Sequence, residues 1–374
     1  MEAKHLSGRL VNYDILRIFA AYLIVMLHLS VQYINKAPIS VDEYLNWQQA
    51  VKLATVSRVG VPIFVMLSGA FLLRPDREIS LITIFRKYLP KLVILFVFWS
   101  LFYSLAEQGF FENLVSSGLS DSWNAIDWNK FWPYFAQGHY HMWYLYMLAG
   151  LYLLTPLIKH ITAHASKAQL IYFVVLCVLV TSVTKLNQEL WNISLLDIIW
   201  DKLSLSFFLG YIGYYVAGYL LSTYTPGWRI SAVVFVLGIL SFRFTYQETW
   251  KLNPMFGFEH PNLIYFSNYS PTVFIMSFAV FLLAAKLIFM NSWKPLQILM
   301  GYLPQYMLVV YLVHPFIITQ CRAAGILLPT ESAWSLPQNA FIIYIISLAV
   351  SVLIMQFYRL VLKLPKLVFR TGRC

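Results

Sequence analysis

The chain has 374 residues, of which 60% are hydrophobic, 17% aromatic and 11% charged, and its formal net charge is +11. Soluble domains carry about 25% charged residues, so this composition excludes a water-soluble globular protein. A bilayer-spanning helix needs about 20 mainly apolar residues, and helices satisfy their own backbone hydrogen bonds. We therefore expect an all-α integral membrane protein.

Apolar stretches of that length recur along the whole chain, and they predict a bundle of about ten transmembrane helices. The first stretch carries Asp14 and Arg17 and lacks a small-residue cleavage pattern, so we interpret it as a permanent helix and not as a signal peptide. The predicted spans are residues 12–34, 50–73, 88–107, 141–158, 169–184, 203–222, 228–246, 270–290, 297–318 and 339–362.

The distribution of charge between the two ends of these spans predicts their orientation. With the N-terminus in the cytoplasm, 18 of the 27 Lys and Arg residues fall on the cytoplasmic side, together with only 4 of the 16 acids. The positive-inside rule therefore places both termini in the cytoplasm, and we expect a multi-pass protein of the cell's inner (plasma) membrane. Basic loops beside anionic headgroups explain the net charge, so no nucleic-acid partner is expected.

Polar groups in the first span are the first candidates for function, because a charge inside a span costs about 2.5–3.5 kcal/mol. Asp14 and Arg17 are three residues apart, so they can form an ion pair on one helix face; a purely structural pair is the alternative. Arg17 and His28 are eleven residues apart, roughly 16 Å, and project from one stripe. Histidine exchanges protons near neutral pH, which makes His28 a candidate base, with a satisfied core histidine as the alternative.

The next two spans offer further candidates. Arg58 lies in the outer half of the second span, where it is either a candidate oxyanion donor or a snorkelling structural residue. Ser68-Gly69 favours close helix packing over a covalent serine, since no base lies at a recognisable spacing. Cations entering the third span either anchor the topology or bind the phosphates of a donor such as coenzyme A; they are Arg86, Lys87 and Lys91.

Later candidates lie at the start of the fourth span, namely His141 and Trp143, and in the ninth, namely Tyr311 and His314. Neither these histidines nor the three cysteines have the spacing of a metal motif, so no metal is expected. The longest outer segments, residues 108–140 and 247–269, are rich in Trp, Tyr, Asn and acids. They either contact a carbohydrate or simply cap the bundle.

An ordered set of motifs along essentially the whole chain resembles the membrane-bound acyltransferase 3 family. Within that family the chain is most similar to the stand-alone bacterial surface-polysaccharide O-acetyltransferases typified by the enterobacterial common antigen acetylase. The matching motifs are Asp14-x-x-Arg17 with His28, Ser57-Arg58-Val59 through Val61-Pro62-Ile63-Phe64, Ser68-Gly69, the basic entry to the third span followed by Phe98-Trp99-Ser100, His141-Met142-Trp143-Tyr144, Thr155-Pro156-Leu157 and Tyr311-Leu312-Val313-His314.

The resemblance implies a single transmembrane acyltransferase domain over residues 1–374, without the SGNH hydrolase-like domain of some relatives. It implies an enzyme that transfers groups other than aminoacyl, moving an acyl group, usually acetyl, from cytoplasmic acetyl-CoA or another acyl-CoA to a hydroxyl of a lipid-linked or exported polysaccharide. The membrane lipid bilayer, this glycan acceptor and other polysaccharide-synthesis proteins are the expected partners.

Residue by residue, the resemblance assigns the essential histidine to His28 and the essential arginine to Arg17. It also assigns the cytoplasmic basic motif to Arg86, Lys87 and Lys91, although the family's two-arginine spacing is not kept there.

A polytopic transporter or flippase for a glycan or small polar substrate is the alternative function, because intramembrane charges also mark transport paths. Transporters often show inverted repeats and paired broken helices, and neither is evident in this sequence.

Overall fold

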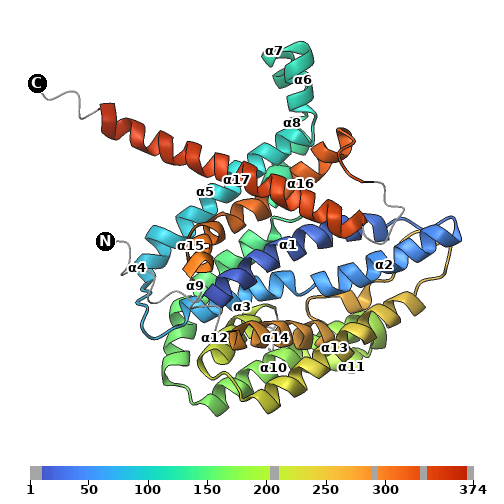
Figure 1. Cartoon of the computed structure of the whole chain (residues 1–374), viewed down its shortest axis with the longest axis vertical. Coiled ribbons are helices and arrows are strands. Elements are labelled where there is room, and N and C mark those ends of the chain that lie inside the picture. The colour runs from blue at the N-terminus through green and yellow to red at the C-terminus, as the bar shows by residue number, and fades with distance from the viewer. Residues whose placement is uncertain (1–10, 203–209, 288–293, 329–334, 369–374) are drawn as a thin grey trace, which may run out of the picture. The chain divides into compact units, whose positions relative to one another are not determined.

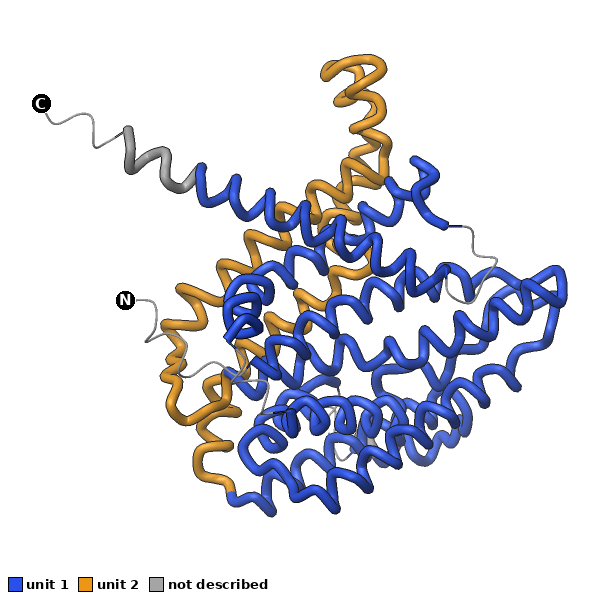
Figure 2. Tube along the Cα trace, viewed as in Figure 1, with its two compact units in different colours: residues 1–71, 166–374 blue, residues 72–165 orange. Residues whose placement is uncertain are grey.

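The structure, a computed structural model, describes residues 11–202, 210–287, 294–328 and 335–368. Within these ranges every regular element is helical and no strand occurs. The all-α class predicted from the sequence is therefore confirmed. The chain divides into two compact units, coloured separately in Figure 2: unit 1 comprises residues 1–71 and 166–374, and unit 2 comprises residues 72–165.

Unit 1 combines helices from both ends of the chain, labelled in Figure 1. From the N-terminal part come α1 (Val11–Ile34), α2 (Val41–Ser57) and α3 (Gly60–Leu72), whose last residue already belongs to unit 2. The later part supplies α10 (Lys167–Leu186), the π-helix η3 (Asn187–Trp191), α11 (Ser194–Lys202), α12 (Ile212–Thr223), α13 (Trp228–Lys251), the 3₁₀ turn η5 (Ile264–Phe266), α14 (Pro271–Lys286), α15 (Lys294–Tyr302), the 3₁₀ turn η7 (Leu303–Tyr306), α16 (Met307–Ala323) and α17 (Ser335–Val368).

Helix α1 is the element against which α2, α14, α16 and α17 pack. The indole Nε1 of Trp47 on α2 donates to the carbonyl oxygen of Ile34 at 2.9 Å, and Gly60 at the start of α3 lies against Ala20 and Ile24. Residues 41–72 therefore run antiparallel to α1 as one span. A Cβ at Gly60 would lie 3.0 Å from Cγ1 of Ile24, so the small residue permits the close approach.

Helices α3 and α12 approach each other still more closely. A Cβ added to Gly69 would lie 1.8 Å from the carbonyl oxygen of Tyr215, and one added to Gly218 would lie 1.9 Å from that of Met66. The two contacts are three residues apart on each helix in opposite chain directions, so the helices are antiparallel with their backbones touching. The close packing predicted from Ser68-Gly69 is confirmed at Gly69.

Unit 2 consists of α4 (Leu81–Thr83), the π-helix η2 (Ile84–Tyr88), α5 (Leu89–Ala106), α6 (Phe110–Ser117), α7 (Leu119–Asn124), α8 (Trp128–Gln137) and α9 (Trp143–His164). Helix α5 packs on both α8 and α9. Helices α6 to α8, which form most of the predicted outer segment 108–140, enclose a small core of Leu105, Phe110, Ile126 and Phe131. The segment is therefore a folded element with its own apolar centre.

Nine helical segments of the described residues are long and apolar enough to cross a membrane. They match nine of the ten predicted spans, although the second begins at Val41, earlier than predicted. The remaining predicted span, 203–222, falls partly outside the described residues; its described part contains the short, buried helix α12. The ninth predicted span is broken, because α15 gives way to the 3₁₀ turn η7 at Pro304 before α16 begins.

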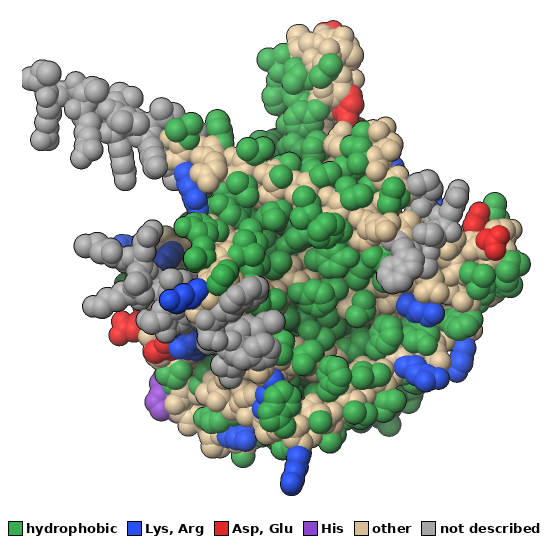
Figure 3. All heavy atoms as spheres, in the orientation of Figure 1, with side chains coloured by type: hydrophobic (Ala, Val, Ile, Leu, Met, Phe, Trp, Pro, Cys, Tyr) green, Lys and Arg blue, Asp and Glu red, His purple; other side chains and the backbone are tan. Residues whose placement is uncertain are grey.

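Hydrophobic side chains cover most of the face drawn in Figure 3. Among the described residues many large hydrophobic side chains are strongly exposed, for example Leu353 and Phe357 on α17, each 69% exposed. Monomeric soluble proteins rarely expose contiguous apolar patches above a few hundred Å². Lipid contact accounts for this surface, in agreement with the membrane class predicted from composition.

Candidate active site

A local ion pair occupies the N-terminal part of α1. Nη1 of Arg17 donates to Oδ1 of Asp14 at 3.3 Å, as their spacing predicted. The Asp14 side chain is only 4% exposed and that of Arg17 27%. The guanidinium also lies over the ring of Phe71 on α3, 5.2 Å from its centroid. The guanidinium of Arg17 is thus held between the carboxylate of Asp14 and the aromatic face of Phe71.

The ring of His28, further along α1, faces that of His314 on α16. Their centroids are 5.0 Å apart and their planes are tilted by 41°. His314 is fully buried, and its Nδ1 lies 3.3 Å from the carbonyl oxygen of Val310. A carbonyl can only accept, so this bond places a proton on Nδ1 and leaves Nε2 of the neutral ring as an acceptor. The ring of Tyr311 lies 5.9 Å from that of His314, so three predicted residues meet here.

Arg58 is positioned by different neighbours. It follows the last residue of α2, in the turn that leads to α3. The expectation that Arg58 lies within a helix is therefore wrong. Its guanidinium carbon is 4.9 Å from the ring centroid of Phe266. Among the described residues, the buried Nε of Arg58 has no hydrogen-bond partner. A buried donor of this kind is costly unless a ligand satisfies it, which keeps Arg58 a candidate for binding an oxyanion.

The three predicted donor-binding cations lie together in unit 2, around the start of α5. Arg86 and Lys87 belong to the π-helix η2, and Lys91 follows one turn later. All three are exposed, and none forms an ion pair with another described residue. Arg74, by contrast, is occupied by a bidentate pair with Asp76, at 3.0 and 2.9 Å. Short π-helical turns are frequent at functional sites.

A hydrogen-bonded chain of titratable groups lies between α5 and α9 of unit 2, and the sequence did not predict it. Nε2 of His139 is 3.3 Å from Oε1 of Glu107, and Nδ1 of His139 is 2.9 Å from Nδ1 of His141. The ring of Tyr103 stacks on that of His139 with centroids 4.2 Å apart. Burial lowers the pKa of His139 from 6.5 to about 4, so this ring is neutral near pH 7.

The side chain of His139 is only 14% exposed. No local pattern could have revealed its partner, since Glu107 lies 32 residues earlier at the end of a different helix. Trp143, the other predicted residue here, is the first residue of α9 and is 40% exposed. The candidates thus form separate groups, with His28, His314 and Tyr311 in unit 1 and the basic cluster, His141 and Trp143 in unit 2.

Neither metal nor disulfide chemistry is indicated by the described part of the chain. No group of three or more His, Cys, Asp or Glu side chains there could hold a metal ion. Cys177 and Cys321 are both buried free thiols.

Comparison with known proteins gave one match. A family model described as an acyltransferase domain matches residues 10–356, which include every candidate residue described above. No curated protein and no solved structure matched the chain.

Proposed function

The chain belongs to the acyltransferase family whose model spans residues 10–356, and from that premise we propose that it is an O-acyltransferase, in the simplest case an O-acetyltransferase. The donor is cytoplasmic acetyl-CoA or another acyl-CoA, and the acceptor is a hydroxyl of a lipid-linked or exported surface polysaccharide. The protein acts in the inner membrane, beside other proteins of polysaccharide synthesis. Its kinship with the enterobacterial common antigen acetylase branch is part of this proposal.

The contact between His28 and His314 is the observation that carries the proposal. His28 is half-buried on α1, so its ring is in a protein environment but is not sealed. In the proposed reaction His28 takes the proton of the sugar hydroxyl while that oxygen attacks the thioester carbonyl. The tetrahedral oxyanion then collapses, the bond from carbon to sulfur breaks, and the coenzyme A thiolate leaves and takes up the proton as the free thiol. The products are the acyl ester and coenzyme A.

The other residues around His28 have supporting roles in this proposal. His314 orients the His28 ring and lends a polar partner to the imidazolium that forms. The ring of Tyr311 contacts that of His314 and fixes its orientation. Arg58, whose buried Nε has no hydrogen-bond partner in the described part of the chain, is the candidate donor to the oxyanion, where a preorganised donor contributes most. Asp14 holds the guanidinium of Arg17 in place on the stripe that leads to His28.

Donor binding is assigned to unit 2. Arg86, Lys87 and Lys91 offer three exposed charges on one short segment, and guanidinium and ammonium groups are suitable partners for the phosphates of an acyl-CoA. His141 and Trp143 are the candidates in this unit for acceptor contact. The reaction as written needs no metal ion.

The test of the proposal replaces His28 by Gln, which keeps a polar side chain of similar size but no base near neutral pH. Acylation of the surface glycan, measured by mass spectrometry at matched protein level, should fall by about 10²–10⁴-fold, the usual contribution of a general base. His164→Gln is the matched control, since His164 is an exposed histidine of α9. Robust acylation by His28→Gln would refute the role of this residue, and an acyl group trapped on His28 would replace direct transfer by a covalent route.

A further inference from the structure

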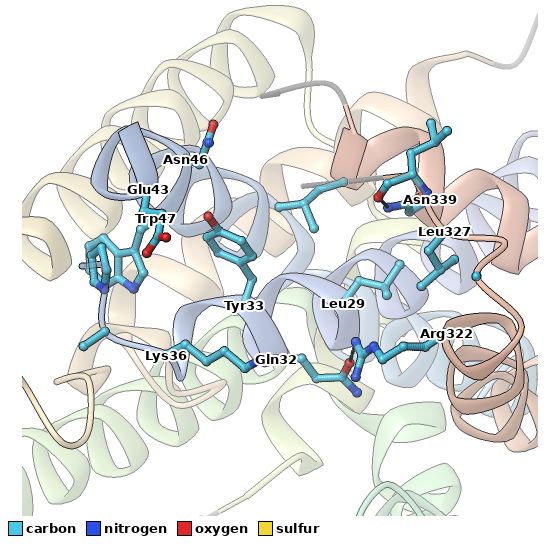
Figure 4. Close-up of a pocket in the computed structure, with 15 residues that line it drawn as sticks. Leu29, Gln32, Tyr33, Lys36, Glu43, Asn46, Trp47, Arg322, Leu327 and Asn339 are labelled. Atoms are coloured by element: carbon cyan, nitrogen blue, oxygen red, sulfur yellow. Dashed lines mark hydrogen bonds between the residues drawn. The ribbon is translucent and has the colours of Figure 1, made fainter. Parts of the chain in front are cut away.

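A cavity of about 570 Å³ lies in unit 1, where the end of α1, the start of α2, the end of α16 and the start of α17 meet (Figure 4). We call it the mouth pocket. Its lining combines aromatic rings, amides and charges, including Tyr33, Trp47, Gln32, Asn46, Lys36 and Arg322. Ligand pockets typically enclose about 300–1,000 Å³, so the mouth pocket can hold a sugar residue. With the N-terminus in the cytoplasm, as the Lys and Arg distribution predicts, the pocket lies at the outer end of α1.

The mouth pocket adjoins the proposed catalytic histidine along α1. Leu29, which lines the pocket, directly follows His28, and Gln32 lies one turn further along the same helix face, about 6 Å away along the axis. The contact between α1 and α16 continues in the same direction. Between these two helices the rings of His28 and His314 are in contact. At the pocket, Nη2 of Arg322 on α16 donates to Oε1 of Gln32 on α1 at 2.6 Å.

The charges of the mouth pocket favour an anion. Lys36 and Arg322 both extend toward Gln32 (Figure 4), and Glu43 is the acid among the lining residues. Oε2 of Glu43 already accepts the backbone N–H of Ile39 at 3.0 Å. On the predicted outer side acids outnumber bases, with 12 Asp and Glu against 9 Lys and Arg. Two of those nine bases line this one pocket, so it is positive in otherwise negative surroundings.

The shape of the lining favours a sugar carboxylate over a bare phosphate. Trp47 is fully buried, and its hydrogen bond to Ile34 fixes the ring, while Tyr33 adds a second, half-buried ring. Of these two rings only that of Tyr33 is partly exposed, so it can offer an apolar face to a ligand, and a few polar groups then fix the ligand's orientation. The guanidinium of Arg322 presents five donors in a planar fork that suits a carboxylate and a phosphate alike, so the ring of Tyr33 is the feature that favours a sugar.

We propose that the mouth pocket binds an acidic sugar of the acceptor glycan, with the sugar carboxylate held by Lys36 and Arg322 and a neighbouring hydroxyl directed to His28. This inference rests on the proposed acyl transfer and specifies the acceptor of that same site. An acidic sugar is selected by charge at the pocket, and the acylated hydroxyl is selected by its distance from the carboxylate.

The test measures binding of two probes, methyl glucuronide and methyl glucoside, to the purified full-length chain in detergent. The glucuronide should bind about tenfold more tightly, the effect of one charge-assisted hydrogen bond, and the difference should shrink with added salt. Arg322→Gln and Lys36→Gln should each remove most of this preference. Lys251→Gln is the control, since Lys251 is an exposed cation outside the pocket that pairs with Glu248. Equal binding of the two probes would overturn the inference.

One further variant excludes a folding defect as the cause of any loss. Glu43→Gln keeps an oxygen acceptor for Ile39 but removes the pocket's acid, so glucuronide affinity should rise about threefold or more. An unchanged affinity in Glu43→Gln, or equally strong competition by inorganic phosphate, would contradict the assignment to an acidic sugar. If the chain acylates a neutral glycan, and the Arg322→Gln variant does so at the same rate, the inference is overturned and the acyltransferase proposal stands. Glucuronide binding that depends on Arg322, in a chain that transfers no acyl group to any glycan, would instead leave the pocket's ligand standing and overturn the acyltransferase proposal.

Discussion

The contact between α3 and α12 allows a stability prediction with a defined magnitude. Substituting Gly69 or Gly218 by Ala places a methyl group 1.8 Å or 1.9 Å from a backbone carbonyl oxygen of the facing helix. An ordinary contact between such atoms is about 3.5 Å, so the helices must separate by more than 1 Å or one must shift along its axis. A backbone oxygen inside a helix has no rotamer by which to move aside.

The expected cost follows from the same geometry. Overpacking a well-packed interior typically costs about 1–3 kcal/mol, and both glycines should reach the upper part of that range because backbone atoms are hit. The double variant should cost less than the sum of the two single ones, since a single separation of the helices relieves both clashes. Gly150→Ala on α9 is the matched control, because a Cβ there meets nothing within 4 Å; it should be neutral or stabilising by about 0.5–1 kcal/mol.

The assay is unfolding of the purified protein in detergent, followed by intrinsic tryptophan fluorescence during heating or titration with SDS. Gly69→Ala and Gly218→Ala should unfold well before the parent chain, and Gly150→Ala with it or after it. Parent-like stability of either clashing variant would refute the direct contact of the two backbones. Strict additivity in the double variant would show that the two glycines belong to independent contacts.

Three further predictions concern the donor site, the histidine chain and the orientation. Replacing Arg86, Lys87 and Lys91 together by Gln should weaken acyl-CoA binding to the purified protein by about tenfold or more, with a smaller effect at high salt; affinity equal to that of the parent chain would leave them as topology anchors. Because burial holds the pKa of His139 at about 4, below its usual 6.5, protonation opposes folding, so stability should be full above pH 6.5 and fall by about 2–3 kcal/mol between pH 6.5 and pH 4. Glu107 and His141 face this ring, and a His139→Gln variant that melts with the parent's pH profile would contradict the cause. A single cysteine at position 77, in a background without Cys177, Cys321 and Cys374, should resist an impermeant thiol reagent applied to intact cells; ready labelling would invert the topology.

The membrane class and most spans could be predicted because hydrophobic length is a local property of the sequence. The pair of Asp14 and Arg17 was predictable for the same reason, since i,i+3 spacing fixes the distance on any helix. The extension of the second span back to Val41 was missed because residues 41–49 carry Asp42 and Glu43, which lower the local hydropathy. Ser40 caps this helix through a hydrogen bond from the backbone N–H of Glu43, a local signal that hydropathy alone does not register.

Contacts between distant segments could not be predicted in this way. His28 and His314 were each candidates, but their ring contact joins residues 286 positions apart. The mouth pocket also depends on tertiary packing, since Gln32 and Arg322 are 290 positions apart. Glu107 and His139 meet only because α5 packs against α8 and α9 in unit 2. Spacing within one helix determines a shared face, whereas helix packing determines which faces meet.

The chain of Glu107, His139 and His141 has a directional consequence. Two imidazole Nδ1 atoms that face each other at 2.9 Å can share only one proton between them. When Glu107 accepts from Nε2 of a neutral His139, the proton between the rings must come from His141, and the outer nitrogen of His141 is then a lone-pair site. Loss of the acceptor at Glu107, whose side chain is 57% exposed, would therefore allow the opposite polarity in a ring that is itself only 1% exposed. Through this chain, a charge at the protein surface sets the donor or acceptor character of an atom in the interior.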